Sequence, residues 1–262
     1  MGLRHFLPAL LVVALAACGG PRAPAPESRA LGTPTPVFGD HKPHDWTTVR
    51  PWDYAVHGID VSKWQGEIDW HQVRASGVAF AFIKATEGGD HADERFAENW
   101  AAARRAGVPR GAYHYYYFCR TAQEQARWFA ANVPPERGAL PPVLDAEWTP
   151  ESRTCRMRPD PATVRSEMAT YLAEVGRHYR KRPVVYTTVD FYRDNELWKL
   201  TGYQFWLRSV ANHPSVVYPG QDWAFWQYTG TGVVPGVRGR ADINAFGGSP
   251  AEWRRWLAAH AQ

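Results

Sequence analysis

From residue 51 onward, short apolar runs rich in β-branched and aromatic residues alternate with longer helical stretches, and this alternation constrains the fold most. The first five predicted strands are residues 56–61, 78–86, 108–118, 140–148 and 183–188, and helices are predicted between them at 70–76, 93–106, 121–132 and 161–179. Beyond them the spacing tightens. Strands are predicted at 203–210, 223–228 and 240–246, followed by a closing helix at 249–259 that Ser249 caps.

Eight strands joined mostly by helices predict an α/β fold, a single modified (β/α) barrel of TIM type with parallel strands and reduced helices in the last third. The alternative is a doubly wound open sheet. The sequence has no Gly-rich phosphate turn after its first predicted strand, which disfavours that alternative.

Acidic side chains gather where the predicted strands end. These are Asp60, Glu87, Asp145, Glu147 and Asp242. In barrels of this type the working residues lie at the carboxyl ends of the strands, so we expect these side chains at one mouth of the barrel.

Asp145 and Glu147 form the most informative pair. They are two residues apart on a strand, so both side chains project from one face, with Cα atoms about 6.5 to 7 Å apart. Two carboxylates in a barrel mouth do not both ionise easily, so one retains a proton while the other stays charged. Glycoside cleavage needs such a division between proton donor and carboxylate. The alternative is a solvated strand end without a catalytic role.

Five ordered motifs resemble glycoside hydrolase family 25, the peptidoglycan muramidases. They are residues 58–66 (GIDVSKWQG), 83–88 (IKATEG), 111–115 (GAYHY), 145–147 (DAE), and the late pair 226–228 (WQY) and 242–244 (DIN). The resemblance covers about residues 55 to 248. It implies a lysozyme that cleaves the β-1,4 bond between N-acetylmuramic acid and N-acetylglucosamine without a cofactor.

The resemblance also implies roles for the acidic residues. Glu147 would be the general acid and then the base. Asp145 would orient the 2-acetamido group of the muramic unit, whose carbonyl oxygen would act as internal nucleophile; direct attack by an Asp is the competing route. Asp60 and Asp242 would complete the acidic cluster.

Aromatic residues are abundant, with 13 Trp, 12 Tyr and 11 Phe, and their flat faces suit sugar rings as well as a core. Tyr113, Tyr186 and Trp226 match positions where the family places groove aromatics, and core packing is the alternative for each. By strand alternation His114 faces away from Tyr113, so we expect it in the core with a satisfied hydrogen bond.

Arg208 departs from the family pattern. Residues 206–209 (WLRS) stand where a Trp, a β-branched residue and then Ala are expected. Arg208 would either enter the groove and meet an anionic group, such as a lactyl or stem-peptide carboxylate, or point to solvent.

The N-terminus is typical of a bacterial lipoprotein. Residues 1–17 have a charged start and an apolar run typical of a secretory signal, and the run ends in a lipobox-like sequence at Cys18. An ordinary signal with an incidental Cys is the alternative. Residues 18–50 contain many prolines and predict a tether, which leaves 51–262 for the barrel. We therefore expect a protein anchored through lipidated Cys18 in the cell envelope, at the outer membrane or a periplasm-facing membrane.

Cys119 and Cys155 are the other cysteines, and export to an oxidising compartment predicts a disulfide between them; two unrelated buried thiols are the alternative. No H-E-x-x-H motif or Cys/His cluster predicts a metal site. The net charge of +4 is spread along the chain, which disfavours a nucleic-acid partner, and we expect a monomer that binds glycan strands. A non-catalytic wall-binding lipoprotein and a hydrolase of chitin-like glycans remain the competing functions.

Overall fold

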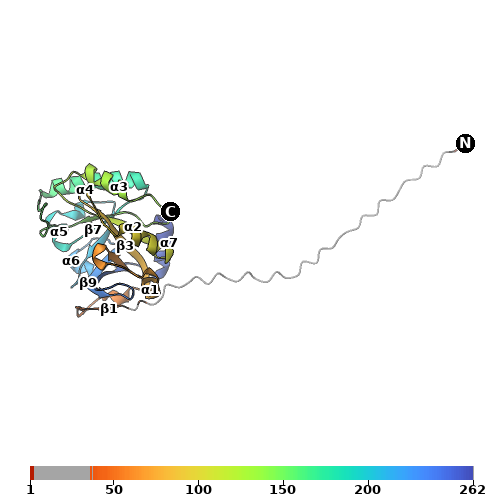
Figure 1. Cartoon of the computed structure of the whole chain (residues 1–262), viewed down its shortest axis with the longest axis horizontal. Helices are drawn as coiled ribbons and strands as arrows, with labels where there is room; N and C mark the ends of the chain where they lie inside the picture. Colours follow the sequence, from red (N-terminus) through yellow and green to blue (C-terminus); the bar gives the residue numbers. More distant parts are fainter. Residues whose placement is uncertain (3–35, 37, 262) are drawn as a thin grey trace. The chain divides into compact units, whose positions relative to one another are not determined.

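The computed structural model of the protein describes residues 1, 2, 36 and 38–261. Its central feature is a closed barrel of eight strands, and Figure 1 shows the helices arranged around the strands. The barrel strands are β2 (His57–Val61), β3 (Val78–Glu87), β5 (Arg110–Tyr115), β6 (Val143–Ala146), β7 (Val184–Thr187), β8 (Gln204–Arg208), β9 (Phe225–Val233) and β10 (Ala241–Phe246). Each strand pairs with the next, and β10 pairs with β2 to close the ring. The predicted (β/α) barrel is confirmed.

The last strand corrects the prediction that all eight strands are parallel. β10 runs antiparallel to both of its neighbours, β9 and β2. Only residues 234–240 separate β9 from β10, which is enough for a hairpin connection but too few for the crossover that a parallel pair requires. Asp242 therefore lies near the beginning of its strand, opposite Asp60 on β2, at the same mouth as the carboxyl ends of the other strands.

Four helices cross over between the first five barrel strands, as predicted. They are α1 (Trp70–Ala75), α2 (Phe96–Arg105), α3 (Ala122–Asn132) and α4 (Pro161–Tyr179). In the last third only short pieces remain, namely α5 (Val189–Asp194), η3 (Leu197–Lys199) and α6 (Pro214–Val217), before the closing helix α7 (Pro250–His260). Side chains that accept amide hydrogen bonds begin these helices where expected, with Thr121 before α3 and Ser249 before α7.

Short elements decorate the barrel. They are β1 (Gly39–Asp40), β4 (His91–Ala92), η1 (Pro51–Asp53) and η2 (Lys63–Gln65). β4 pairs with the end of β3 in a hairpin, and η2 follows β2 at the mouth of the barrel.

The segment before residue 51 corrects the predicted domain boundary. β1 pairs antiparallel with β9, and the Asp40 carboxylate accepts a hydrogen bond from Thr231 Oγ1 at 2.6 Å. The ring of Trp46 meets that of Trp226 edge-on at 5.1 Å between centroids. Residues 38–50 thus belong to the folded domain, because they complete a sheet edge and cover an aromatic surface. The predicted signal (1–17, apart from its first two residues) and Cys18 lie outside the described residues.

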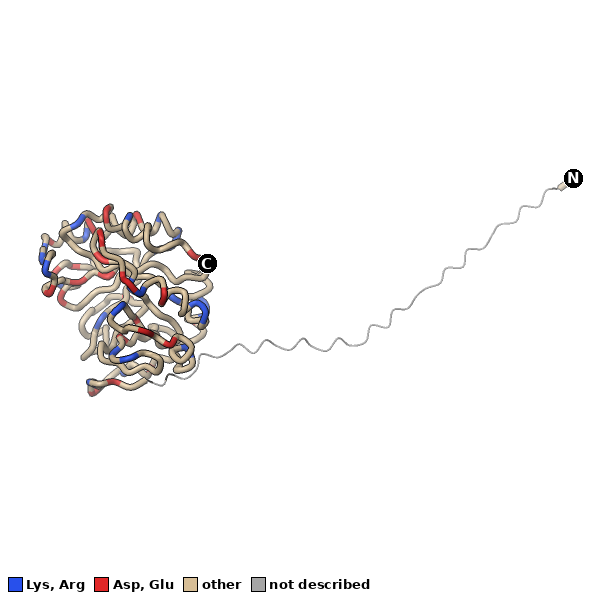
Figure 2. The backbone as a smooth tube through the Cα atoms, viewed as in Figure 1, with Lys and Arg blue, Asp and Glu red and all other residues tan. Residues whose placement is uncertain are grey.

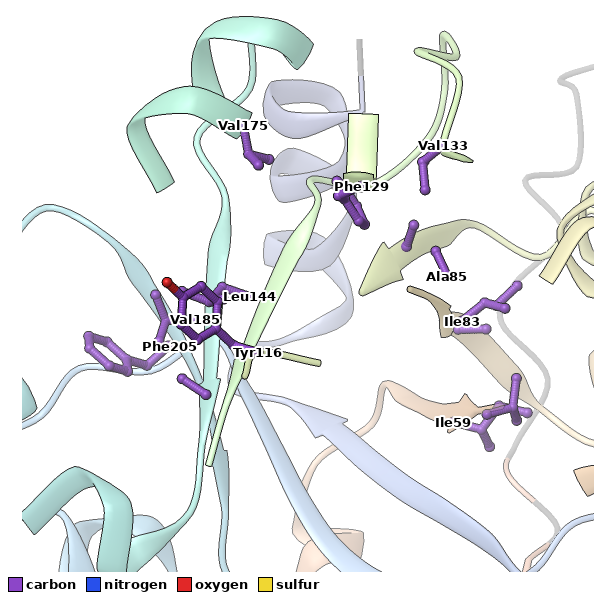
Figure 3. Close-up of a cluster of buried hydrophobic side chains, with 14 of the residues drawn as sticks. Ile59, Ile83, Ala85, Tyr116, Phe129, Val133, Leu144, Val175, Val185 and Phe205 are labelled. Atoms are coloured by element: carbon purple, nitrogen blue, oxygen red, sulfur yellow. The ribbon is translucent and has the colours of Figure 1, made fainter. Parts of the chain in front are cut away.

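An apolar layer fills the space between the barrel and its helices. Ile59, Ile83, Leu144 and Val185 point outward from four of the barrel strands, β2, β3, β6 and β7, and Figure 3 shows them with Phe129 of α3 and Val175 of α4. All of these side chains are buried. Since burial of each large apolar side chain contributes about 1.5 to 3 kcal/mol, this layer holds the helices on the barrel.

The barrel interior is filled by aromatic rings. Phe82 stacks on Trp206 at 4.6 Å between ring centroids and meets Phe225 edge-on at 5.2 Å. Gly58 makes room for this packing, since a Cβ there would lie 2.5 Å from the ring of Phe80. Two tryptophans of α7, Trp253 and Trp256, pack below Phe225 and Phe246 and close one end of the barrel. The polar side chains at the mouth therefore rest on an apolar floor.

Acidic and basic residues are interspersed over the folded domain (Figure 2). Among the described helices, none is long and apolar enough to cross a membrane.

Candidate active site

Four carboxyl groups predicted from the sequence converge at the mouth. Asp60 comes from β2, Asp145 from β6, Glu147 from the residues just after β6, and Asp242 from β10. Strand alternation turns them inward, because their neighbours Ile59, Val61, Leu144 and Ala146 pack in the outer layer. Asp60 and Asp242 are direct partners in the sheet register.

Asp60 is held by a buried chain of hydrogen bonds. Its Oδ2 accepts from Asn244 Nδ2 at 2.8 Å and from Gln227 Nε2 at 3.0 Å. Tyr186 donates to Gln227 Oε1 at 2.9 Å, and Trp206 donates through Nε1 to Asn244 Oδ1 at 2.7 Å. Burial raises the pKa of Asp60 to about 6, although both amide donors favour its charged form. The Asp60 carboxylate is thus fixed in place and able to exchange a proton near neutral pH.

Asp242 holds its proton more strongly than Asp60. Burial, followed by the nearby charge of Asp60, raises the pKa of Asp242 to about 8. Its Oδ1 lies beside Gly230 of β9, where a Cβ would come within 3.0 Å of it. Once Asp60 ionises, the repulsion between the two acids therefore keeps Asp242 neutral.

Asp145 and Glu147 differ in exposure, although the pKa of each is raised. Asp145 is 8% exposed, and its buried Oδ1 has no hydrogen-bond partner among the described residues. Burial, and next the charge of Glu147, raises the pKa of Asp145 well above its usual range. Glu147 is only partly buried. Burial also raises its pKa, while Arg208 and the Tyr115 hydroxyl oppose that rise.

A lysine lies beside this pair. Lys84 is inward-facing on β3, its ammonium lies 4.7 Å from the centre of the Tyr115 ring, and it pairs with Glu87 Oε2 at 2.5 Å. Burial is the largest cause of the raised pKa of Asp145 and of Glu147. The positive charge of Lys84 has a smaller effect and lowers both pKa values. Glu87, which we expected at the mouth, therefore serves as the partner of Lys84, and Tyr117 also donates to it at 3.1 Å.

The three predicted groove aromatics have different positions. Tyr113 and Tyr186 face the barrel interior. Burial raises the pKa of both hydroxyls, and the nearby charges of Asp60 and Asp145 raise it further. Trp226 faces outward and is fully buried, with its Nε1 donating to the Ser209 carbonyl at 2.8 Å. The expectation that Trp226 lines the groove is therefore wrong, and the reason is alternation, because its neighbour Gln227 occupies the inward position.

Two further predictions on the strands and loops are confirmed. His114 is fully buried outside the barrel, bonded to Thr86 Oγ1 at 2.8 Å and Gln125 Oε1 at 3.1 Å, and burial lowers its pKa to about 4. Cys119 and Cys155 form a disulfide with an S–S distance of 2.10 Å. It joins the loops that follow β5 and β6 next to the mouth.

Sequence reasoning did not single out Lys84, Tyr115, Gln227 and Asn244. Each carried a usable signal, because each lies an even number of residues from an inward-facing side chain on its own strand. The described residues contain no group of three or more His, Cys, Asp or Glu side chains arranged to bind a metal ion.

A family model for glycosyl hydrolases family 25 matches residues 59–237, which include Asp60 and the Asp145–Glu147 pair. The chain belongs to glycosyl hydrolase family 25. It is 37% identical to lysozyme M1 of Streptomyces globisporus over 223 residues, covering 79% of this chain and 73% of that protein.

Solved structures of family 25 agree with this assignment. The structure of a family 25 glycosyl hydrolase from Bacillus anthracis superposes with a TM-score of 0.72 at 29% identity, covering 86% of this chain and all 100% of that one. A bacterial lysozyme from Streptomyces coelicolor gives a TM-score of 0.69 at 36% identity, covering 79% and 97% of the two chains. As a family 25 member, the protein is a glycoside hydrolase on a modified (β/α) barrel.

Proposed function

We propose that the protein is a muramidase that hydrolyses the β-1,4 bond between N-acetylmuramic acid and N-acetylglucosamine in peptidoglycan. The observation that carries the proposal is the Asp145–Glu147 pair, in which a deeply buried carboxyl adjoins a partly exposed one above an apolar floor. Lysozymes in the same family support peptidoglycan as the substrate.

Glu147 is the proposed general acid and base. Its exposure gives a glycan access to the carboxyl, and its raised pKa favours a bound proton at the start of the reaction. Glu147 donates this proton to the glycosidic oxygen as the bond from that oxygen to C1 of the muramic unit breaks. It then accepts a proton from the water that attacks C1.

Asp145 is the proposed partner of the substrate acetamido group. The Asp145 carboxyl is 8% exposed and forms no side-chain hydrogen bond among the described residues, so it can accept the acetamido N–H. In this position it directs the acetamido carbonyl oxygen toward C1, where that oxygen forms the bond that replaces the leaving oxygen. Water then opens this intermediate with the configuration at C1 retained.

Asp60 and Asp242 support the pair through charge. Asp60 is fixed by Asn244 and Gln227, and Asp242 is its partner across the strand pair. Both side chains raise the pKa of Asp145, although burial and the charge of Glu147 have larger effects. They therefore help to hold a proton in the cluster at neutral pH.

The proposal is tested with cell-wall sacculi and chitin oligomers. Wild-type protein is compared with Glu147→Gln, and Glu151→Gln serves as a control with the same change on an exposed residue of the following loop. New reducing ends are reduced with borohydride and identified by mass spectrometry. We expect muramic acid ends from wild type and the control, and a loss of about 10²- to 10⁴-fold in Glu147→Gln.

Three results would contradict the proposed function or its mechanism. Cleavage by Glu147→Gln at the wild-type rate would remove Glu147 from the mechanism. Products only from chitin oligomers would assign the site to a neutral glycan, and binding to sacculi without any cleavage would indicate a non-catalytic wall-binding protein.

We further propose that the mature protein is a monomeric lipoprotein of the cell envelope, anchored through Cys18. The lipobox-like sequence at residues 15–19 and the prolines of the following segment support this assignment. Membrane fractionation of cells that produce the wild type or Cys18→Ala tests it. Equal membrane association of the two proteins would refute the anchor.

A further inference from the structure

Arg208 occupies the last position of β8, on the inward side of the barrel. Phe205 and Leu207 of the same strand pack in the outer layer, whereas Trp206 packs inside against Phe82. Arg208 shares the side of Trp206 and pairs in register with Gln227, the residue that holds Asp60. Its side chain therefore enters the mouth and does not point away from the barrel.

The guanidinium of Arg208 has no partner within the described part of the chain. The guanidinium forms no ion pair and donates no hydrogen bond there, although the backbone carbonyl of Arg208 accepts from the Tyr218 hydroxyl at 2.7 Å. By contrast, Arg110 on β5 is paired. It bonds Glu136 at 2.8 Å and the Trp100 carbonyl at 2.8 Å.

Arg208 nevertheless belongs to the electrostatics of the site. Its charge opposes the effect of burial on the pKa of Glu147, Asp60 and Asp242. Because the side chain is only partly buried, its donors remain accessible from the mouth. The planar guanidinium has free donors that match the two oxygens of a carboxylate.

We propose that Arg208 binds a carboxylate of the glycan substrate and makes the site select anionic glycans over neutral ones. This inference rests on the proposed muramidase function. In peptidoglycan the carboxylate has two sources, which are the lactyl group of a muramic unit that carries no peptide and a free carboxyl of the stem peptide. In both cases Arg208 is a specificity residue that contributes to substrate affinity.

Four substrates separate the sources. Peptide-free glycan strands are prepared with lactyl carboxylates free or capped as methylamides, and peptide-bearing strands with stem carboxylates free or capped. KM and kcat are measured for wild type and Arg208→Gln, each at its own pH optimum. Arg105→Gln is the matched control, because Arg105 is exposed at the end of α2 and forms no ion pair in the described region.

We expect wild type and Arg105→Gln to have a KM about 10-fold or more lower for the free than for the capped form of one substrate pair, since charged hydrogen bonds contribute about 1.5 to 3 kcal/mol. A preference within the peptide-free pair identifies the lactyl group, and one within the peptide-bearing pair identifies the stem. In Arg208→Gln the KM preference is lost, and any change in kcat that follows from the altered pKa of Glu147 is the same for the free and the capped form of each substrate pair. Arg208→Lys keeps the charge without the planar fork, so it retains part of the preference.

Equal KM values for all four substrates with wild type would overturn the role of Arg208, as would a preference that survives in Arg208→Gln or disappears in Arg105→Gln. Muramic acid reducing ends would still support the muramidase in each of these cases. If wild type cleaves none of the substrates, the proposed function fails, and the same free-to-capped ratio measured as Kd by calorimetry decides the role of Arg208. Thermal unfolding of each variant identifies any that does not fold, and Arg208→Lys then replaces Arg208→Gln.

Discussion

The acidic cluster at the mouth makes a testable contribution to stability, and Asp242→Asn isolates it. The Asp242 pKa is raised from 3.8 to about 8, first by burial and then by Asp60. A carboxyl with a raised pKa in the folded state favours folding below its unfolded pKa. It loses that contribution as the pH rises toward the folded pKa, because the unfolded chain releases its proton first. The stability of the wild type should therefore fall between pH 4 and pH 7.

The size of the fall follows from the shift. About three pH units at 1.36 kcal/mol per unit give about 4 kcal/mol between pH 4 and pH 7. Asp242 keeps some contact with water, so we take half of this, about 2 kcal/mol, as the expected value. Asparagine has nearly the same shape and no proton to lose, so relative to wild type Asp242→Asn should gain this amount from pH 4 to pH 7.

Urea unfolding followed by tryptophan fluorescence measures the difference at both pH values. Asp45→Asn is the control, since Asp45 is exposed and forms no hydrogen bond or ion pair within the described residues. It should change stability by less than about 0.5 kcal/mol at either pH. The reasoning is refuted if the difference between Asp242→Asn and wild type is the same at pH 4 and pH 7, or becomes less favourable at pH 7.

Three further changes test the fold around the site. Replacing Cys119 and Cys155 by Ser removes a cross-link across a sequence separation of 36, so unfolding free energy should fall by about 4 kcal/mol and Tm by about 8 to 16 °C; an unchanged Tm under oxidising conditions would contradict this. Gly58→Ala places a Cβ 2.5 Å from the ring and the carbonyl of Phe80 on β3, so urea unfolding should show that the free energy of unfolding falls by about 3 kcal/mol. Wild-type stability of this variant would show that the barrel interior adapts to the added methyl group. Asn244→Ala removes a donor to Asp60, so carboxyl ¹³C titration should find the Asp60 pKa above its wild-type value of about 6, and a lower value would be inconsistent with the network.

Local patterns predicted the elements of the fold well. The helix at 161–179 has the same bounds in the structure, because Asp160, Pro161 and the apolar spacing all favour one beginning and one face. The direction of β10 was not predictable from its own residues. It depends on the short connection after β9, and strand patterns carry no information on direction. The packing of residues 38–50 was missed for a similar reason, since a proline-rich composition hides the two residues of β1 that pair with β9.

At the site, the sequence singled out the four carboxyl groups that converge and also Glu87, which instead pairs with Lys84, and it did not predict how each group is held. Asp242 was placed at the mouth as the end of a parallel strand, whereas it reaches the mouth as the start of an antiparallel one. Trp226 and Gln227 are adjacent, so one of them must face outward, and the resemblance pointed to the wrong one. The bonds from Asn244 and Gln227 to Asp60 join strands far apart in the chain, which only the closed ring brings together.

The arrangement of the mouth explains why a cluster that opposes folding is tolerated. Phe82, Trp206 and Phe225 form a packed floor that keeps water from the lower side of the carboxyl groups, so burial is the largest cause of every raised pKa in the cluster. Arg208 and Lys84 offset part of this effect from the rim without pairing with Asp145 or Glu147. A direct ion pair would fix the charge of the acid and lower its pKa, which would remove the proton that glycoside cleavage needs. The free guanidinium of Arg208 and the protonated carboxyl of Glu147 therefore share one cause, which is the absence, among the described residues, of a direct ion pair between the two groups. Arg208→Gln tests the first and Glu147→Gln tests the second, and both leave the apolar floor unchanged.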